Sequence, residues 1–237
     1  MPTGALDIVF TLRDEPIQVF EDETDDRGER YGGAVVHGAQ SRYFVLEGKP
    51  HVSTVGVHFW PGGAAPFFPA AELADRHVAL DDLWGGAGSL RDRLIDATSP
   101  AARFAMLEQA LIARLGRAPL VHPVVSYALR RIGAAPTLAR VEQVREQTGY
   151  GAKRFIELLR HTVGLTPKIY CRIRRFDAAI ALAASGARVE EWAKVAADSG
   201  YFDQSHLNRD FRSFAGLVPG AYRPVSAQRR HHIAVAS

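Results

Sequence analysis

Polar side chains able to hydrogen-bond in several directions gather near the C-terminal end of the chain. Over positions 204–212, amide, hydroxyl, imidazole and guanidinium groups alternate with apolar residues: Gln204, Ser205, His206, Asn208, Arg209 and Arg212. Leu207, Phe211 and Phe214 recur at spacings of four and three, so on a helix they would face a core and leave the polar groups outside. Such groups suit the edges of bases and phosphates in a DNA groove. A solvated polar helix face is the simpler alternative.

The elements that would position these groups form two similar helix pairs, at 138–161 and 190–214. In each pair a short helix ends at a glycine, Gly149 or Gly200, a tyrosine follows, and a second helix begins within a few residues. Glycine suits a tight turn between steeply crossing helices because it adopts positive φ without a Cβ clash. Ala196, four residues before Gly200, would let the second pair approach closely. This is the helix-turn-helix arrangement, whose second helix lies in the DNA major groove.

The first pair offers its own outward side chains and one departure from the pattern. The exposed candidates for DNA contact on its second helix are Lys153, Arg154, Glu157 and Arg160. The departure is Arg145, which stands four residues before Gly149, where a small residue is usual. Either its stem runs outward along the surface, or the unit is splayed and reads DNA less tightly.

One longer helix is expected to join the two pairs. It would begin at Pro167 and end near Ala184, with an apolar stripe of Ile169, Ile173, Phe176 and Ile180. Its other face carries four cations: Lys168, Arg172, Arg174 and Arg175. We expect the last three, together with Arg223, to supply phosphate contacts.

Charge is distributed unevenly along the 237 residues, whose formal net charge is +3. Residues 1–117 hold 11 basic and 17 acidic side chains, whereas residues 118–237 hold 18 and 9. The second half is therefore the one expected to meet a polyanion. Apolar residues make up 47% of the chain, enough for a sizeable core. No stretch reaches the ~18–20 apolar residues of a membrane helix and no leader pattern opens the chain, so we expect neither membrane insertion nor export.

Periodicity and turn residues predict strands first and helices afterwards. The expected strands are 7–12, 17–20, 42–46 and 52–59, with 21–30 as a surface loop and 60–69 irregular because three prolines and two glycines interrupt it. The expected helices are 80–85, 89–97, 100–115, 124–132, 138–147, 152–161, 167–184, 190–198 and 204–214. The boundary is placed at 115–123, and the tail from Ser226 is expected to be frayed.

The helical half resembles a known family. The stretch from Val189 through Gly200-Tyr-Phe-Asp203 to Arg212, with Gly216, Pro219 and Tyr222-Arg223, resembles the C-terminal half of the AraC/XylS DNA-binding domain. Phe155, Val163-Gly-Leu-Thr-Pro-Lys168 and Arg174-Arg-Phe176 resemble its first half. The resemblance covers about residues 124–225. It implies a bacterial transcription regulator whose two helix-turn-helix units enter successive major grooves.

The first half resembles, less specifically, the N-terminal domain of one group of AraC-type regulators. The resemblance rests on Asp7-Ile-Val-Phe10, on the segment Val55–Phe68 and on Leu80-Asp-Asp-Leu-Trp-Gly85. It implies a small β-barrel followed by helices. Relatives carry residues before the first strand that are absent here, so either the chain starts late or the barrel lacks an edge strand. The expected fold is therefore α+β, with a β-barrel-like sensing or dimerisation domain at 1–117 and an all-α DNA-binding domain at 124–225.

An enzyme is the rival interpretation of the first half. A cupin-like barrel with a helical appendage could gather His37, His51, His58 and His77 around a metal, but no His-x-His pair occurs and the carboxylates cluster elsewhere. No phosphate-binding loop or nucleophile elbow is present, and the single cysteine, Cys171, is expected to be buried. We therefore expect no catalytic residue, metal or cofactor. The aromatic side chains around the Pro-Gly loop could instead line a ligand pocket, a dimer face or plain packing: Phe59, Trp60, Phe67 and Phe68.

The sequence thus predicts a one-component, sequence-specific regulator of bacterial promoters. Double-stranded operator DNA is its expected partner, in a reducing cytoplasm and near the nucleoid. A small-molecule effector and a homodimer are open alternatives for the first half, as is RNA polymerase if the protein activates transcription.

Overall fold

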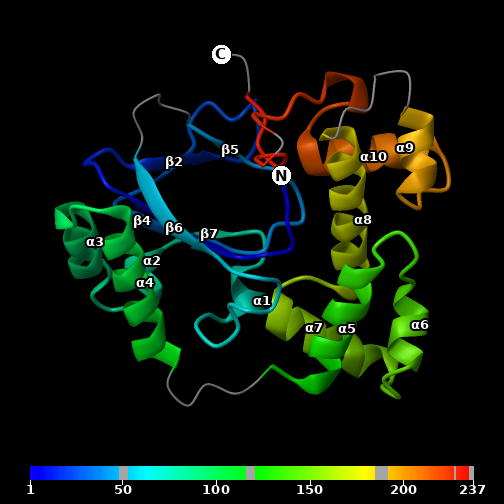
Figure 1. Ribbon diagram of the computed structural model, residues 1–237, viewed down its shortest axis with the longest axis horizontal. Coiled ribbons are helices and arrows are strands. Elements are labelled where there is room, and N and C mark those ends of the chain that lie inside the picture. Colours follow the sequence, from blue (N-terminus) through cyan, green and yellow to red (C-terminus); the bar gives the residue numbers. More distant parts are fainter. Residues whose placement is uncertain (48–52, 116–120, 185–191, 227, 235–237) are drawn as a thin grey trace.

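A computed structural model describes residues 1–47, 53–115, 121–184, 192–226 and 228–234. Two small sheets with short helices form one side of the molecule, and a group of helices forms the other (Figure 1). The α+β class expected from the sequence is confirmed.

The larger sheet is antiparallel and has the strand order β6-β1-β4-β7. Its strands are β1 (Asp7–Thr11), β4 (Ala34–His37), β6 (Thr54–His58) and β7 (His77–Ala79). Alternation along β1 sends Ile8 and Phe10, both fully buried, into a core on one face. Residues 7, 9 and 11 are left for the opposite face.

The smaller sheet has the order β3-β2-β5 and packs near that opposite face. It consists of β2 (Ile17–Phe20), β3 (Glu29–Tyr31) and β5 (Val45–Leu46). Val19 and Tyr31 pack with Val35 of the larger sheet in a small separate cluster. Within the described ranges the strands form these two sheets and no closed barrel.

Short helices cover the core face of the larger sheet. They are α1 (Ala70–Leu73), α2 (Leu80–Leu83), α3 (Ala87–Asp96) and α4 (Pro100–Leu115). The rings of Phe68 and Trp84 stack at 5.0 Å in this layer. Pro100 begins α4, as expected of a residue whose missing N–H costs nothing in a first turn.

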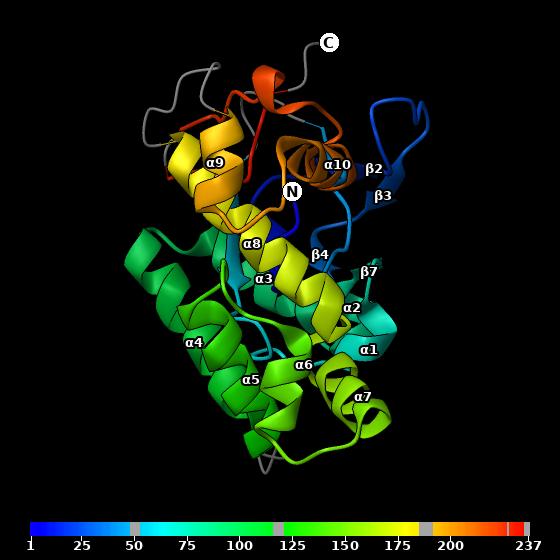
Figure 2. The same cartoon turned by 90° about the vertical axis from the view of Figure 1, so that its right-hand side faces the viewer.

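The second core belongs to the helical half. Its elements are α5 (Pro123–Ala134), α6 (Val141–Glu146), α7 (Ala152–Val163), α8 (Pro167–Ala184), α9 (Trp192–Asp198), α10 (Gln204–Ala215) and the 3₁₀ turn η2 (Pro219–Ala221). α8 runs between α5, α6 and α7 at one end and α9 and α10 at the other (Figure 2). No helix of the described ranges is both long and apolar enough to cross a membrane.

Most expected helices occur within a few residues of their predicted bounds, and α4 and α8 have the predicted ends. The strands differ more. β4 and β7 were not predicted, and Glu29 and Arg30 belong to β3 rather than to a loop. Three-residue strands such as β7 carry too little periodicity to identify, because pairing with a neighbour stabilises them. Residues 48–52, 116–120 and 185–191 lie outside the described residues, and with them most of the boundary predicted at 115–123 and the start of the helix predicted at 190.

The tail was expected to fray, and that expectation is wrong for its described part. Pro224 pairs with Ile233, and the Tyr222 hydroxyl donates to the carbonyl oxygen of Arg230. The Arg230 guanidinium forms an ion pair of 2.9 Å with Asp177 of α8. The buried carboxylate of Asp177 in the helical half, which a local sequence pattern cannot reveal as a partner, holds the tail in place.

Candidate nucleic-acid interface

α8 holds the two helix pairs together through an apolar stripe. Ile173, Phe176 and Ile180 are fully buried, and Ile169 is partly buried against the same core. Phe176 meets the rings of Phe211 and Phe214 edge-on at 4.9 and 5.4 Å. The stripe predicted from the sequence therefore fixes α10 on one side of α8.

The turn of the second pair depends on its glycine. Gly200 has φ of 76°, and a Cβ there would lie 2.2 Å from the carbonyl oxygen of Thr137. Ala196, four residues earlier, is 1% exposed. A small residue and a glycine at this spacing thus let the second pair close tightly and touch the loop before α6.

α10 separates its side chains into two faces. Leu207, Phe211 and Phe214 are fully buried. Four predicted contact residues are exposed and make no side-chain hydrogen bond or ion pair with any other described residue: Gln204, Ser205, Arg209 and Arg212. The helix starts at its N-cap, Asp203, whose carboxylate accepts the backbone N–H of His206 at 2.7 Å. The exposed face of α10 therefore has a fixed position, and these four side chains have no partner among the described residues.

The other two predicted residues of α10 are partly covered. The His206 ring lies edge-on to Tyr201 at 5.1 Å. The side-chain oxygen of Asn208 is buried and has no hydrogen-bond partner among the described residues. Both side chains sit at the border between the core and the open face.

Three of the four cations of α8, the arginines, make contacts within the protein. Arg172 donates from its Nε and Nη2 to Asp210 of α10, at 3.2 and 2.6 Å. The Tyr201 hydroxyl donates to the other oxygen of the same carboxylate, and burial together with the Asp210 charge raises the pKa of Tyr201. The Arg175 guanidinium lies over the Tyr201 ring at 5.6 Å, and Arg174 pairs with Asp177 at 3.2 Å. Lys168 is exposed.

The first pair presents a similar open face on α7. Phe155 and Leu159 are fully buried, whereas Lys153, Arg154, Glu157 and Arg160 are exposed. Arg154 and Glu157 pair with one another at 3.6 Å. α7 and α10 both end at a glycine in the left-handed conformation, Gly164 and Gly216.

Arg145 lies across the turn of the first pair. Its Nη1 donates to the carbonyl oxygen of Tyr150 at 3.2 Å, and its Nη2 pairs with Glu146. The guanidinium therefore bridges the two ends of the turn instead of only running outward. Arg223, after η2, is exposed and donates to the carbonyl oxygens of Gly220 and Tyr222.

One exposed residue beside this face was missed by the sequence analysis. Phe202, between the turn and the N-cap of α10, is 94% exposed. A large apolar residue just before an N-cap is the signal that could have found it, because such a residue normally packs onto the helix.

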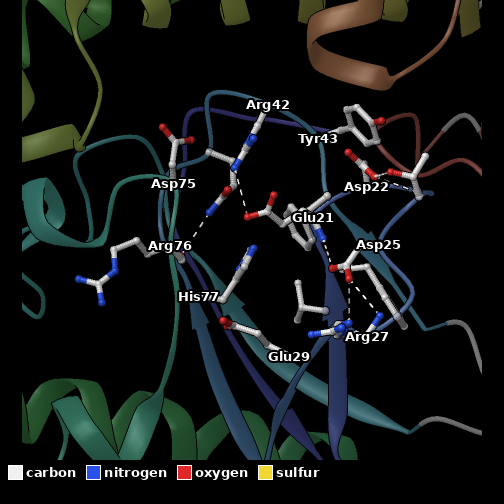
Figure 3. Close-up of a pocket in the computed structure, with 16 residues that line it drawn as sticks. Glu21, Asp22, Asp25, Arg27, Glu29, Arg42, Tyr43, Asp75, Arg76 and His77 are labelled. Atoms are coloured by element: carbon white, nitrogen blue, oxygen red, sulfur yellow. Dashed lines mark hydrogen bonds and ion pairs between the residues drawn. The ribbon is translucent and has the colours of Figure 1, made fainter.

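The two larger cavities among the described residues both border the sheets. One, of about 610 Å³, is lined by charged side chains of the loop after β2 and by Arg42, Arg76 and His77 (Figure 3). The Asp22 carboxylate accepts the hydroxyl and then the backbone N–H of Thr24, and the Asp25 carboxylate accepts backbone N–H groups of the same loop, which lowers the pKa of both. These acidic groups therefore shape the loop.

The second cavity, of about 590 Å³, lies between the larger sheet and the helical half. Its wall includes Val9, Val57 and Trp60 on the sheet side and Arg174 and His231 on the other. It is mostly apolar with a few polar groups, the composition usual for small-molecule sites.

His37 supplies a buried polar atom on the wall of the second cavity. Cross-strand register aligns His58, Asp7, His37 and His77 in one row of the sheet. The Nδ1 atoms of His37 and His77 lie 2.7 Å apart, and the Nε2 of His37 is buried without a partner among the described residues. Burial, with the neighbouring His77, lowers the pKa of His37 to about 3, and burial lowers that of His77 to about 4.

The four aromatic residues predicted as ligand candidates do not act together. Phe59 and Phe68 are buried in the core of the first half, and Phe67 is partly buried beside them. Trp60 is 85% exposed and reaches the second cavity. Three of the four therefore pack between sheet and helices, which was the plainer alternative.

The histidines and the cysteine show no catalytic assembly in the described ranges. No three His, Cys, Asp or Glu side chains there are grouped so that they could hold a metal ion, and His51 falls outside those ranges. His58 pairs with Asp7 at 2.5 Å, which raises the pKa of the histidine. Cys171 is buried, and burial raises the pKa of its thiol to about 11.

Two known domain families match parts of this chain. Residues 144–224 match a family described as a helix-turn-helix domain, and residues 1–79 match a domain of unknown function (DUF6597). None of the curated proteins matches the chain. The structure is similar to that of ToxT from Vibrio cholerae O395 bound to (E)-4-(8-methylnaphthalen-1-yl)but-3-enoic acid, with 11% identity, a TM-score of 0.48, and 94% of this chain and 91% of that chain covered. It is also similar to unsaturated fatty acid bound wild-type ToxT from strain SCE256, with 10% identity, a TM-score of 0.47, and coverage of 91% and 85%.

Two helix pairs around one joining helix, each with an open polar second helix, define a helix-turn-helix DNA-binding protein. Within that class, residues 144–224 of this chain form a helix-turn-helix domain of the matched family, and residues 1–79 belong to the DUF6597 domain.

Proposed function

We propose that α7 and α10 enter two successive major grooves on one face of operator DNA, and that α10 provides most of the base readout. The observation that carries this proposal is the free polar face of α10, held on α8 by three fully buried apolar side chains. Hydrogen-bonding groups read bases only when they are not already paired within the protein. The proposed base-reading residues are Gln204, Ser205, His206, Asn208, Arg209 and Arg212.

The remaining proposed contact residues differ in whether their side chains already bind another group within the protein. Lys153, Arg154, Glu157 and Arg160 of α7 are exposed and would read the second groove. Arg172, Arg174, Arg175 and Arg223 remain proposed phosphate contacts, although each already binds a carboxylate, a ring or a carbonyl within the protein. Their charges favour DNA even where their geometry is occupied.

Selection from a random-sequence DNA pool at two salt concentrations tests this proposal. The expected result is a motif of two segments about one helical turn apart, with affinity that falls steeply as salt rises. Arg209→Ala should change the motif, whereas Arg93→Ala, which removes an exposed cation from α3, should leave it unchanged. Salt-sensitive binding with no motif would contradict base readout by α10, and absence of binding would contradict DNA as the partner.

We infer further that residues 1–117 form a sensing or dimerisation domain and that the second cavity accepts a small-molecule effector. A ligand there would touch the sheet and, through Arg174 and His231, the helical half that carries the DNA face. Its apolar walls, the unpaired Nε2 of His37 and nearby cations favour an apolar molecule with one hydrogen-bonding or anionic group.

Thermal unfolding in the presence of a panel of aliphatic and aromatic carboxylic acids tests the effector proposal. A ligand that binds only the folded state raises Tm as its concentration rises. His37→Gln should weaken that rise, while His161→Gln, which changes an exposed histidine on α7, should not. A rise that is equal in both variants would place the ligand elsewhere.

We also propose that the chain is not catalytic and does not act as a metal-dependent enzyme. We further propose that the protein resides in the cytoplasm near the nucleoid and forms a homodimer. If it activates transcription, it would also contact RNA polymerase. Metal analysis of protein purified without a histidine tag checks the first point, because a stoichiometric metal would revive the enzyme.

A further inference from the structure

Phe202 is the most exposed large apolar side chain of the described residues, at 94%. Leaving a phenylalanine in water forgoes the stabilisation that burial would give. Its neighbours on the helix side, Asp203, Gln204 and Ser205, are exposed and polar. Phe202 is thus a single exposed ring at the start of a polar segment, which favours a small apolar contact over an extensive protein interface.

The position of Phe202 in the chain makes its exposure unusual. It directly precedes the N-cap Asp203, and a hydrophobic residue there normally packs onto the fourth residue of the helix. That residue is Leu207, which is fully buried in the core. At 94% exposure Phe202 does not form this staple, so helix α10 gains no packing from it.

The N-terminal end of a recognition helix is the part that contacts base edges. In the major groove the only apolar group on a base edge is the methyl group of thymine, and phenylalanine is among the side chains that suit it. We propose that Phe202 is a specificity-determining residue that contacts a thymine methyl group beside the bases read by Gln204 and Ser205. This inference depends on the proposed insertion of α10 into the major groove.

The test removes each side of the contact separately. The duplex selected by the full wild-type chain is synthesised with deoxyuridine in place of thymidine, one position at a time, which deletes the methyl group and keeps the base pairing. At one thymine, the wild-type chain should lose about fourfold in affinity, the factor that corresponds to ~0.8 kcal/mol for one buried methyl group. Phe202→Ala should bind the thymine and uracil duplexes equally.

Two matched variants accompany this cycle. Phe202→Leu keeps an apolar side chain and should retain part of the discrimination. Phe104→Ala removes another exposed aromatic side chain, on α4 in the first half of the chain, and should discriminate as the wild type does. Thermal unfolding should be unchanged in Phe202→Ala, because the side chain packs against almost nothing.

The outcomes separate this inference from the proposed function. If every uracil substitution affects the wild type and Phe202→Ala equally, the inference is overturned while base readout by α10 stands. If the wild type selects no motif at all, both are overturned. A thymine preference that disappears from the motif selected by Phe202→Ala supports the contact independently.

Discussion

At the scale of single residues, the structure separates cations that are free from cations that are already paired. Arg209 and Arg212 of α10 project from the helix with no described partner, whereas Arg172 binds a buried carboxylate. The same residue type therefore has two roles in neighbouring elements. Only the free guanidinium groups can form the bidentate contact with guanine that distinguishes bases.

Arg209→Ala tests the free group. If Arg209 contacts a guanine through two hydrogen bonds, its loss should cost about 1–3 kcal/mol, or roughly a 5- to 150-fold rise in Kd for the selected duplex. Preference at one base pair should relax, while Arg93→Ala leaves it intact. Binding curves on duplexes substituted at each position check this. Unchanged affinity and preference would remove Arg209 from the reading set.

The buried histidines predict how stability depends on pH. The pKa values of His37 and His77 are about 3 and about 4 in the folded protein, below the ordinary 6.5. Between these lowered values and pH 6.5, the unfolded chain therefore binds more protons than the folded chain. Their contribution is complete above about pH 6.5 and is lost as pH falls toward 3. His58, whose pKa is raised, has the opposite sign: its contribution is present below 6.5 and is lost as pH rises through its raised pKa.

Urea unfolding at pH 7 and pH 5 measures this effect. The urea concentration at the unfolding midpoint of the wild type should be lower at pH 5 than at pH 7. The decrease should be smaller in His37→Gln, because glutamine keeps hydrogen-bonding groups but does not titrate. An equal fall in both proteins would show that His37 does not carry the pH dependence.

At the scale of elements, α8 is the part that sets the geometry of the proposed DNA face. Its buried stripe fixes α10, and Arg172 ties it to Asp210, which is 1% exposed. Removing one partner of a buried pair leaves an unpaired charge, whereas replacing both by apolar residues often costs little. The main role of the Arg172–Asp210 pair is therefore to fix the position of α10 on α8, rather than to add net stability.

Arg172→Ala should consequently destabilise the protein by about 3–5 kcal/mol, while Arg172→Met with Asp210→Asn should lose less, because it leaves no buried charge and keeps an acceptor for the Tyr201 hydroxyl. Chemical denaturation of both variants checks the difference. DNA affinity of the stable double variant then separates the two roles of Arg172. An unchanged affinity would restrict Arg172 to positioning, and a uniform loss with a smaller salt slope would identify a phosphate contact.

At the scale of the whole molecule, the two halves touch at several places. α1 packs on α7, and a Cβ on Gly216 would lie 2.5 Å from the ring of Tyr43, which belongs to the loop before β5. The tail adds a further clasp: Arg174, Arg230 and His231 surround Asp177. Burial would raise the pKa of Asp177, but these hydrogen bonds and charges outweigh it and lower the pKa to about 2.

Arg230→Ala tests the clasp, with the neighbouring Arg229→Ala as its control. Arg229 is exposed and forms no described ion pair, so both variants lose the same charge but only one loses hydrogen bonds to a carboxylate. Arg230→Ala should lower stability by roughly 1–3 kcal/mol, and Arg229→Ala should not. Equal Tm values for the two variants would contradict the clasp.

Local patterns in the sequence predicted the helices and the two faces of α10. The spacing of Leu207, Phe211 and Phe214 matches the helical period, so burial of one face follows from the sequence alone. Gly200 and Ala196 likewise predicted a tight turn, because the turn needs positive φ and a close approach.

Tertiary structure decided everything that depends on residues far apart in the chain. The row from His58 to His77 exists only because antiparallel pairing aligns four strands, and the second cavity needs both halves. Arg172 looked like a free cation because its partner, Asp210, lies 38 residues away. The sequence determined which residue types each element carries, while packing determined which of those groups remained free to meet DNA, since a polar group already paired in the fold cannot satisfy a second partner without losing the first.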